Sequence, residues 1–315
     1  MTAREIVDMV DMLHGQPMVR IVDCLRAFVA LDVERVHKML VGSDYGQIEA
    51  RIVAWLAGHE PDLDVFRNDL DIYLKAASDI YRREVTKADD KERTIGKVST
   101  LALGFQGGVG AFQSMARIYG VYFDDGEADA IKEAWRDARP KVGDYWAKLE
   151  RAAKKAIEKP RTLVRVKSEY ATVTFCKVGS FLWCELPSKR RIYWAYPKIK
   201  KKMMPWGKEK DTIYFKGVDS VTGKWCEQNT YSGKIMENIV QATARDLIAD
   251  ALVRMVKDPD GPLPVMHVHD EIVAQAPAGS NSAAYELETV MCDLPDWAKT
   301  LPVKAEGWTG DCFRK

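Results

Sequence analysis

Two short apolar segments, far apart in the chain, each end at acidic residues. Lys38–Ser43 is followed by Asp44, and a pair of predicted strands, Leu263–Val268 and Ile272–Ala276, is joined by His269–Glu271. Carboxylates at strand ends are held rigidly, and their charge costs stability unless a cation neutralises it. The fold must therefore bring the two ends of the chain together around a large insertion.

Paired carboxylates of this kind suit a particular chemistry. Two aspartates that hold divalent cations about 3.5–4 Å apart form a clamp for in-line attack on a phosphate. Ligands that are all oxygen favour Mg²⁺ or Mn²⁺. Asp44 and Asp270 are the candidates, with Glu271 beside them. The competing interpretation of an isolated acidic hairpin tip is a solvated turn.

The segments between and around these strands predict an α+β fold. Apolar positions recur at helical spacing in several segments, whereas the stretch 162–230 alternates as strands do and is broken by Pro and Gly. Residues 1–38 are predicted to be mixed and mostly helical. The other predicted helices begin after Gln47, span Asp71–Tyr81, run from an Asp89 or Asp90 cap to about Leu103, and cover Gly126–Glu158 and Met236–Val256.

The net charge of +1 conceals a strong asymmetry. Residues 151–234 carry 20 Lys and Arg against 7 Asp and Glu, a net +13, and the rest of the chain carries −12. Aromatic residues lie among these cations, and bases stack on such rings. The block therefore predicts a nucleic-acid surface next to an acidic site, although its lysine-rich loop alone equally fits a solvated face.

Composition also excludes several classes of protein. No apolar run approaches the length of about 18 residues typical of a membrane span. Charged residues within the first ten positions exclude a secretory signal peptide. The six cysteines form no CxxC pair, which indicates reduced thiols rather than a disulfide frame or zinc site. We therefore expect a cytoplasmic protein with no membrane partner.

The predicted third helix places two cations on one face. Arg93, Lys97, Leu101 and Phe105 are spaced by four residues and form a stripe. The cations lie toward the helix N-terminus, where the helix dipole disfavours positive charge. A bound anion such as a triphosphate accounts for this arrangement, and an ordinary amphipathic helix with surface cations is the alternative.

Five segments stand in a fixed order along the chain: Val41–Arg51, Arg93–Phe105, Leu186–Arg190, Asn238–Asp246 and Val268–Ile272. Together they resemble the family A DNA polymerases, that is, the DNA polymerase I family with its bacteriophage branch. In order, they are similar to motif A (usually DYSQIELR), motif B, LPSGR, the minor-groove helix and motif C of that family. The order and spacing agree over roughly residues 20–313.

The resemblance implies a role for each matching residue. Asp44, Asp270 and the Tyr45 carbonyl would bind two Mg²⁺ ions, with Mn²⁺ as a substitute, and Glu271 and Lys97 would assist catalysis. The nucleotide would be held by Tyr45, Gln47, Glu49, Arg93, Lys97, Leu101 and Phe105, with Glu49 as a steric gate against the ribose 2′-OH. The residues expected to contact DNA are Arg190, Lys234, Gln241 and His269.

The implied architecture is a right-hand polymerase with an antiparallel palm and helical fingers. The palm would comprise 1–60 and 151–315, the latter with a basic β-rich insertion, and the fingers 61–150. The thumb and exonuclease would be absent. Primer–template DNA and dNTPs are the expected partners, together with a second polypeptide carrying the thumb, with or without an exonuclease. A shortened natural chain is the alternative to such a split enzyme.

Some positions depart from the family pattern. Leu101 stands where Phe or Tyr is usual, Phe105 replaces Tyr, Tyr73 replaces a His, and Gly46 replaces Ser. With the metal ligands and both motif B cations intact, the sequence predicts an active DNA polymerase with altered nucleotide selection. The alternatives are a single-subunit RNA polymerase, which Glu49 disfavours, and a non-catalytic DNA-binding subunit of a replication complex, which the intact acids disfavour.

Overall fold

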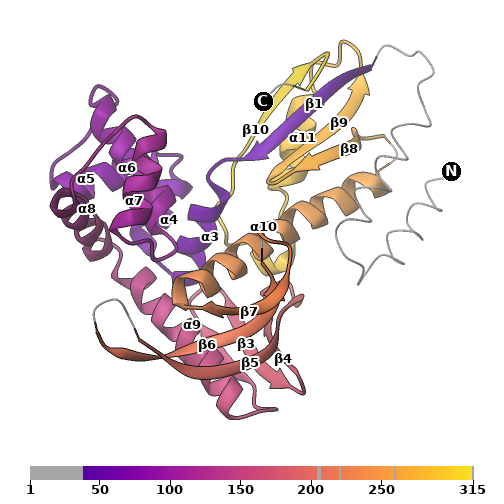
Figure 1. Ribbon diagram of the computed structural model, residues 1–315. Helices are drawn as coiled ribbons and strands as arrows, with labels where there is room; N and C mark the ends of the chain where they lie inside the picture. Colours follow the sequence, from indigo (N-terminus) through magenta and orange to yellow (C-terminus); the bar gives the residue numbers. More distant parts are fainter. Residues whose placement is uncertain (1–37, 204–206, 220, 259, 314–315) are drawn as a thin grey trace. The chain divides into compact units, whose positions relative to one another are not determined.

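The computed structural model describes residues 38–203, 207–219, 221–258 and 260–313 (Figure 1). The predicted helical character of residues 1–37 lies outside this range. The described residues form two compact units. The first combines residues up to Ile48 with 244–299 and 303 onward, and the second comprises 49–243 with 300–302.

The first unit is built on a four-stranded antiparallel sheet. Its strands are β1 (Lys38–Tyr45), β8 (Leu263–Val268), β9 (Glu271–Pro277) and β10 (Ala305–Gly310), in the order β10-β1-β9-β8. Helix α11 (Ala283–Cys292) packs against β1 and β10, and a 3₁₀ turn, η1, follows at Asp296–Ala298. The two acid-bearing segments of the sequence are therefore neighbours, as predicted, while β10 and α11 were not predicted.

Alternation along β1 explains its central place in this sheet. Val41, Ser43 and Tyr45 are buried, and the Tyr45 hydroxyl donates to the Met291 carbonyl oxygen at 2.6 Å. These residues fix one face of the strand against α11. By the two-residue period of a strand, Gly42 and Asp44 point to the opposite face.

The described part of the second unit begins with seven helices. The stretch Gly126–Glu158 is helical, as predicted, but it forms two helices, because Pro140 starts a new helix after Arg139. Pro61 lies in the first turn of the helix that starts at Glu60, a position where proline is tolerated. The helices are α3 (Ile48–Ala57), α4 (Glu60–Arg67), α5 (Ile72–Tyr81), α6 (Asp90–Leu103), α7 (Val109–Ile118), α8 (Asp125–Asp137) and α9 (Pro140–Glu158).

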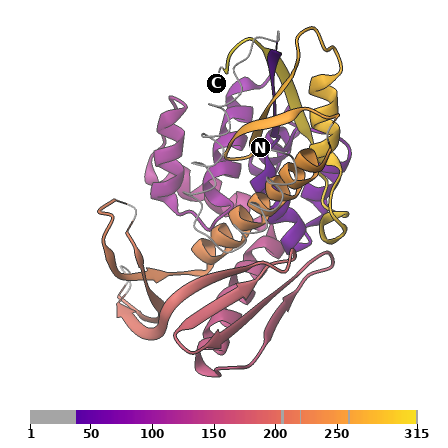
Figure 2. The ribbon, with the colours of Figure 1, turned by 90° about the vertical axis from the view of Figure 1, so that its right-hand side faces the viewer.

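The predicted β-rich region is a six-stranded antiparallel sheet in sequential order, with α9 packed against it (Figures 1 and 2). A bulge between Ala195 and Lys198 interrupts the pairing of its fourth and fifth strands. The strands are β2 (Val164–Lys167), β3 (Thr172–Val178), β4 (Phe181–Glu185), β5 (Arg191–Met203), β6 (Glu209–Val218) and β7 (Trp225–Thr230).

The 26-residue helix α10 (Ser232–Lys257) contributes residues to both units. It extends the predicted helix Met236–Val256 by four residues at its start. Its apolar residues Met236, Ile239 and Val240 are fully buried. Within the described part of the chain, no helix is long and apolar enough to cross a membrane, and the five described cysteines are free thiols.

A buried arginine ties the helices of the second unit together. Arg139 precedes α9 and is 3% exposed. Its guanidinium pairs with Asp62 of α4 through two bonds of 2.9 and 3.1 Å and lies 3.3 Å from Asp79 of α5. Arg139 therefore links the start of α9 to α4 and α5, and removing one partner would leave an uncompensated buried charge.

Close packing of α5 against α6 yields a test of this fold. A Cβ on Gly96 would lie 2.0 Å from the Tyr73 carbonyl oxygen, whereas a Cβ on Gly143 of α9 meets nothing within 4 Å. We expect Gly96→Ala to lower the free energy of unfolding by about 1–3 kcal/mol through overpacking. Gly143→Ala, the matched control, should raise it by about 0.5–1 kcal/mol. Denaturant titration measures both, and equal effects would contradict the close packing of α5 against α6.

Candidate active site

Three carboxylates lie in register across the sheet of the first unit. Asp44 of β1 is directly opposite Glu271 of β9 on one side and Glu306 of β10 on the other. Directly opposed residues share a face of the sheet, with Cβ atoms about 4.5–5.5 Å apart. Asp44 is half-buried, Glu271 is 4% exposed, and Glu306 is exposed. Like charges in this arrangement repel, so the row favours a bound cation.

Asp270 reaches the same edge through the hairpin between β8 and β9. The loop consists of His269 and Asp270, because Val268 pairs with Glu271. His269 adopts a positive φ of 54°, which a tight hairpin turn requires. The Tyr45 N–H donates to the Asp270 carbonyl oxygen at 3.2 Å, so the loop is fixed beside the end of β1.

The Tyr45 side chain belongs to the core. Burial raises the pKa of Tyr45, which keeps its hydroxyl protonated on the Met291 carbonyl. The Tyr45 hydroxyl is therefore bound within the core. The predicted metal ligand is a different group of this residue, its backbone carbonyl.

The donor set fits a hard divalent cation. Asp44, Asp270 and Glu271 offer only oxygen atoms, which Mg²⁺ and Mn²⁺ prefer. Among the described residues, no group of three or more His, Cys, Asp or Glu side chains converges as a ready-made metal site. The described residues therefore place two aspartates and a flanking acidic row, all with oxygen donors, on adjacent elements of one sheet.

The two motif B cations lie on α6 in the second unit, and both have partners within the protein. Arg93 donates from Nε to Asp71 Oδ2 at 2.7 Å. The Tyr73 ring lies 5.6 Å from the Arg93 guanidinium carbon and 6.0 Å from Lys97 Nζ. Lys97 also lies 4.9 Å from the centre of the Tyr119 ring. Burial raises the pKa of Tyr73, so its phenol stays neutral between the two cations.

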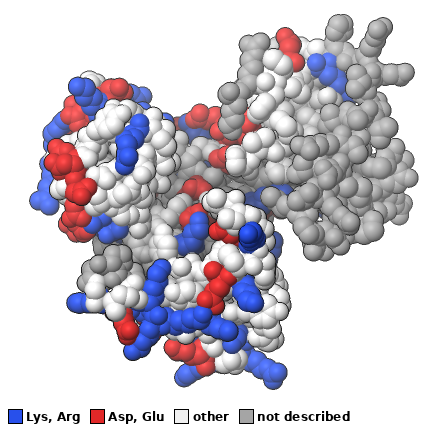
Figure 3. All heavy atoms as spheres, in the orientation of Figure 1, with Lys and Arg blue, Asp and Glu red and all other residues white. Residues whose placement is uncertain are grey.

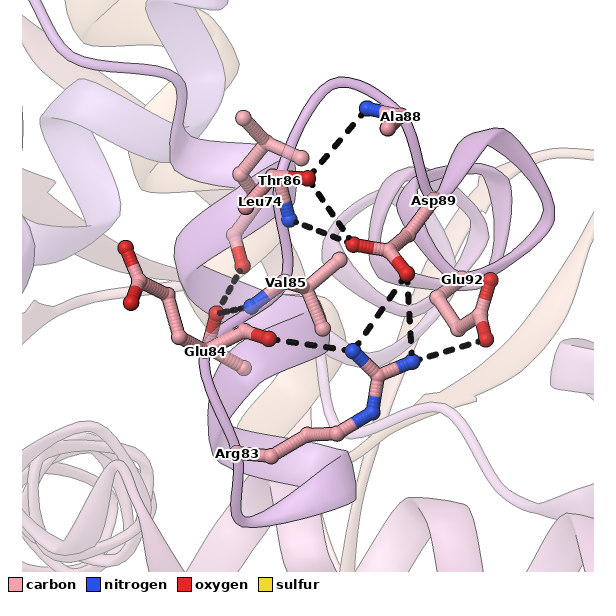
Figure 4. Close-up of polar contacts among 9 residues, drawn as sticks. Leu74, Arg83, Glu84, Val85, Thr86, Ala88, Asp89 and Glu92 are labelled. Atoms are coloured by element: carbon pink, nitrogen blue, oxygen red, sulfur yellow. Dashed lines mark hydrogen bonds and ion pairs between the residues drawn. The ribbon is translucent and has the colours of Figure 1, made fainter.

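A polar network before α6 holds the start of this helix (Figure 4). Arg83 donates to Glu92 at 2.9 Å and, more weakly, to Asp89 at 3.4 Å. Asp89 is the residue before the helix, as predicted, but its side chain makes no capping bond to α6. It accepts instead from the N–H and hydroxyl of Thr86, at 2.8 and 3.0 Å. The predicted cap therefore stabilises the turn rather than the helix end.

The two apolar residues of the stripe, Leu101 and Phe105, lie in different elements of the structure. Leu101 is 40% exposed on the helix, but Phe105 lies beyond the last helical residue, Leu103. The next residue, Gln106, has a φ of 62° and binds the start of α10 through Ser232 Oγ and the Gly233 N–H. Phe105 therefore belongs to the junction between α6 and α10.

The predicted sugar gate and one predicted DNA contact lie side by side. Gln241 of α10 donates to Glu49 Oε1 of α3 at 3.2 Å. Arg190 donates to the Ala242 carbonyl oxygen at 2.7 Å and so links the Leu186–Arg190 turn to α10. Lys189 in this turn has a φ of 71°, which is the conformation that favours the glycine of the LPSGR pattern. Lys234 is exposed and pairs with Glu237 at 2.8 Å.

The basic block is organised by the alternation of its strands. Lys198 and Lys200 pair with Tyr214 and Thr212 of β6, so they share one face, while Lys201 points to the other. Lys200 Nζ lies 5.0 Å from the Tyr214 ring and pairs with Glu227. Figure 3 shows Lys and Arg side chains over this sheet, with acidic side chains among them. Part of the +13 charge is thus neutralised locally.

The predicted site residues fall into two groups. Asp44, Tyr45, Gln47, His269, Asp270 and Glu271 belong to the first unit, and Glu49, Arg93, Lys97, Leu101, Phe105, Arg190, Lys234 and Gln241 belong to the second. Sequence reasoning missed Glu306 and Tyr119. Glu306 is recognisable only from strand register. Tyr119 follows a helix, α7, that was not predicted.

Comparison with known proteins supports the assignment by sequence and by structure. Residues 20–174 match the sequence profile of DNA polymerase family A. The chain is 37% identical, over 323 aligned positions and its whole length, to the DNA polymerase of Bacillus phage SP02. Over about half of its length, the chain is therefore similar to DNA polymerase family A. A shorter region of 93 residues is 36% identical to DNA polymerase I of Chloroflexus aurantiacus.

The fold agrees with that of a solved family A polymerase. The POL domain of Pol1 from M. smegmatis, in complex with DNA primer-template and dNTP, matches 89% of this chain with a TM-score of 0.56 at 17% identity. The alignment covers 40% of that chain. The chain also spans about half the length of the phage relative, 47%. The α+β polymerase fold expected from the sequence is therefore confirmed.

The double role of Asp71 generates a prediction for the motif B cations. Its Oδ1 accepts from the Tyr73 and Leu74 N–H groups and caps α5, while Oδ2 holds Arg93. Asp71→Asn retains a capping oxygen but removes the charge that competes for Arg93. We expect it to tighten binding of a dNTP by about two- to fivefold, the range for a partly exposed ion pair. Nucleotide titration by fluorescence measures this.

Asp71→Ala is the matched variant. It should release Arg93 as well but lose the cap, lowering the free energy of unfolding by about 0.5–2 kcal/mol. Weaker dNTP binding in Asp71→Asn would show that Asp71 orients Arg93 rather than competing for it.

Proposed function

We propose that this chain catalyses template-directed DNA synthesis, in which a primer 3′-hydroxyl attacks the α-phosphate of a dNTP and pyrophosphate leaves. One observation carries the proposal. Asp44 on β1 lies directly opposite Glu271 on β9, and the hairpin loop with Asp270 is hydrogen-bonded to the end of β1. The names of the relatives and of the structural neighbour point the same way. A second polypeptide carrying a thumb stays a prediction.

Asp44, Asp270 and the Tyr45 carbonyl would hold two Mg²⁺ ions, and Mn²⁺ fits the same oxygen donors. When bound, the cations would lower the barrier by neutralising charge on the attacking and leaving oxygens. The protein contributes rigidity: β1 is paired on both sides, and the hairpin tip is fixed by the Tyr45 N–H. Glu271 adds negative charge beside Asp44.

Arg93 and Lys97 are proposed to bind the triphosphate. Their partners, Asp71 and the rings of Tyr73 and Tyr119, hold the two side chains on one face of α6. An incoming triphosphate would exchange these partly exposed contacts for charge-assisted hydrogen bonds, which are roughly twice as strong as neutral ones. Leu101, exposed on the same stripe, offers apolar contact to the base without aromatic stacking.

Glu49 is proposed as the steric gate that disfavours a ribose 2′-hydroxyl. The Gln241 amide fixes the carboxylate at 3.2 Å, which limits how far Glu49 can turn away from an added hydroxyl. This geometry favours a DNA polymerase over an RNA polymerase. We propose that four residues contact the primer–template: Gln241, His269, Lys234 and Arg190. Arg190 also holds its own turn against α10.

The test of the proposed function is primer extension by the aspartate variants. Asp44→Ala or Asp270→Ala should abolish extension, because each removes a proposed metal ligand. DNA binding should stay near wild type, since phosphate contacts by Lys and Arg dominate affinity. Extension and fluorescence anisotropy on the same primer–template separate the two effects. Near-wild-type turnover in either variant would refute the two-metal assignment, and a wild-type chain that binds DNA but never extends a primer would favour a non-catalytic subunit.

The basic sheet is proposed to track the duplex backbone with the face that carries Lys198, Lys200 and Tyr214. Replacing Lys198 and Lys200 together by alanine should weaken binding and reduce the log–log salt slope by up to about 0.9 for each lysine–phosphate pair removed. Lys201→Ala is the matched control, because this exposed lysine lies on the opposite face and pairs with Glu209 at 3.3 Å. Equal slopes in the double variant and the control would reassign the sheet to a solvated surface.

A further inference from the structure

Trp308 lies beside the acidic row of the first unit. It follows Glu306 by two residues on β10 and therefore shares its face. Its strand partner is Gly42, which precedes Asp44 by two residues on β1. The indole occupies the space above this glycine, because a Cβ on Gly42 would lie 2.2–2.4 Å from three indole atoms. Only glycine at position 42 allows the ring to cross β1.

On the far side of β1 the indole reaches Glu271. Trp308 Nε1 donates to Glu271 Oε1 at 2.9 Å. Glu271 is the first residue of β9, is 4% exposed, and lies opposite Asp44. One side chain thus spans three strands, from β10 over β1 to β9. The Phe313 ring, 6.1 Å away, packs against the indole.

The hydrogen bond from Trp308 stabilises the Glu271 carboxylate, whose burial costs free energy. A buried carboxylate next to a second carboxylate is destabilised by desolvation and by repulsion. A hydrogen bond from a rigid donor offsets part of that cost and restricts Glu271 to one rotamer. The ring also excludes water from this side of the row, and a less polar environment strengthens the attraction of the acids for a cation.

We infer that Trp308 is a positioning residue that fixes Glu271 beside Asp44 and thereby sets the affinity of this edge for divalent cations. The inference rests on the proposed metal binding by Asp44 and Asp270. Groups that orient the acids of a metal site typically change metal affinity by about 10–100-fold when they are replaced. A purely structural role for Trp308 predicts lower stability with unchanged affinity.

The experiment measures Mn²⁺ binding to the full chain, alone and with primer–template, by the EPR signal of the free ion. Trp308→Phe keeps a ring over Gly42 but removes the N–H donor. Gly42→Ala keeps every polar group but displaces the indole. We expect both variants to weaken Mn²⁺ binding at the Asp44 and Asp270 site by about tenfold or more. The Mg²⁺ concentration for half-maximal extension should rise in parallel, with the KM for dNTP little changed.

Trp297→Phe is the matched control, since Trp297 lies in η1, outside the acidic row. It should leave Mn²⁺ affinity unchanged. Thermal unfolding of each variant shows whether it folds, and the use of two variants with different defects keeps the test decisive if one of them does not fold.

A double-mutant cycle with Glu271→Gln decides whether Trp308 acts through Glu271. If it does, Trp308→Phe should have little further effect on Mn²⁺ affinity once Glu271 is replaced, because the two residues are coupled. Additive effects, or wild-type affinity in both Trp308→Phe and Gly42→Ala, would overturn the inference while leaving the proposed function intact. Failure of the proposed function differs: Asp44→Ala and Asp270→Ala would then bind Mn²⁺ as the wild type does, and the inference would fall with it.

Discussion

The constraint on which the first unit depends is the placement of like charges across its central strand. Asp44 faces Glu271 and Glu306 in register, at a spacing at which carboxylates repel. Burial of the opposite face of the strand offsets this repulsion and keeps the strand paired. Val41, Ser43 and Tyr45 provide that anchor beneath α11. The buried face of β1 therefore stabilises the strand, and the opposite face can carry the acidic row.

In the second unit, the two cationic side chains of motif B, Arg93 and Lys97, both contact other groups of the protein. Arg93 is paired with Asp71, and Lys97 lies against two tyrosine rings. The turn before α6 fixes the helix through Arg83 and Asp89, which leaves these cations on a rigid frame. Lys97, held by uncharged rings, is already ordered and therefore loses less entropy when an anion binds, whereas the Asp71 carboxylate competes with an anion for Arg93. The sequence departure at Tyr73 fits this arrangement, because a ring at that position contacts both cations.

Sequence periodicity was sufficient for much of this organisation but not for its details. The strands around Asp44 and Asp270, the helices α5, α6 and α10, and the β-rich region follow from local pattern. β10 escaped prediction because the glycines at 307 and 310 interrupt its alternation, and its identity as a strand depends on pairing with a distant segment. The contact between Trp308 and Glu271 depends on register across three strands, which no local pattern encodes.

Backbone strain occurs in turns that carry or adjoin the predicted site residues. Among the described residues, several non-glycine residues have positive φ, and three of them lie in motif-like turns: Gln47 at 51°, Lys189 at 71° and His269 at 54°. Such conformations cost about 1–3 kcal/mol each and persist where surrounding contacts over-determine them. Here the contacts are the Tyr45–Asp270 bond beside His269 and the Arg190–Ala242 bond beside Lys189. Each of these two turns therefore presents its neighbour, Asp270 or Arg190, in a fixed orientation, and the helix–sheet framework offsets the strain.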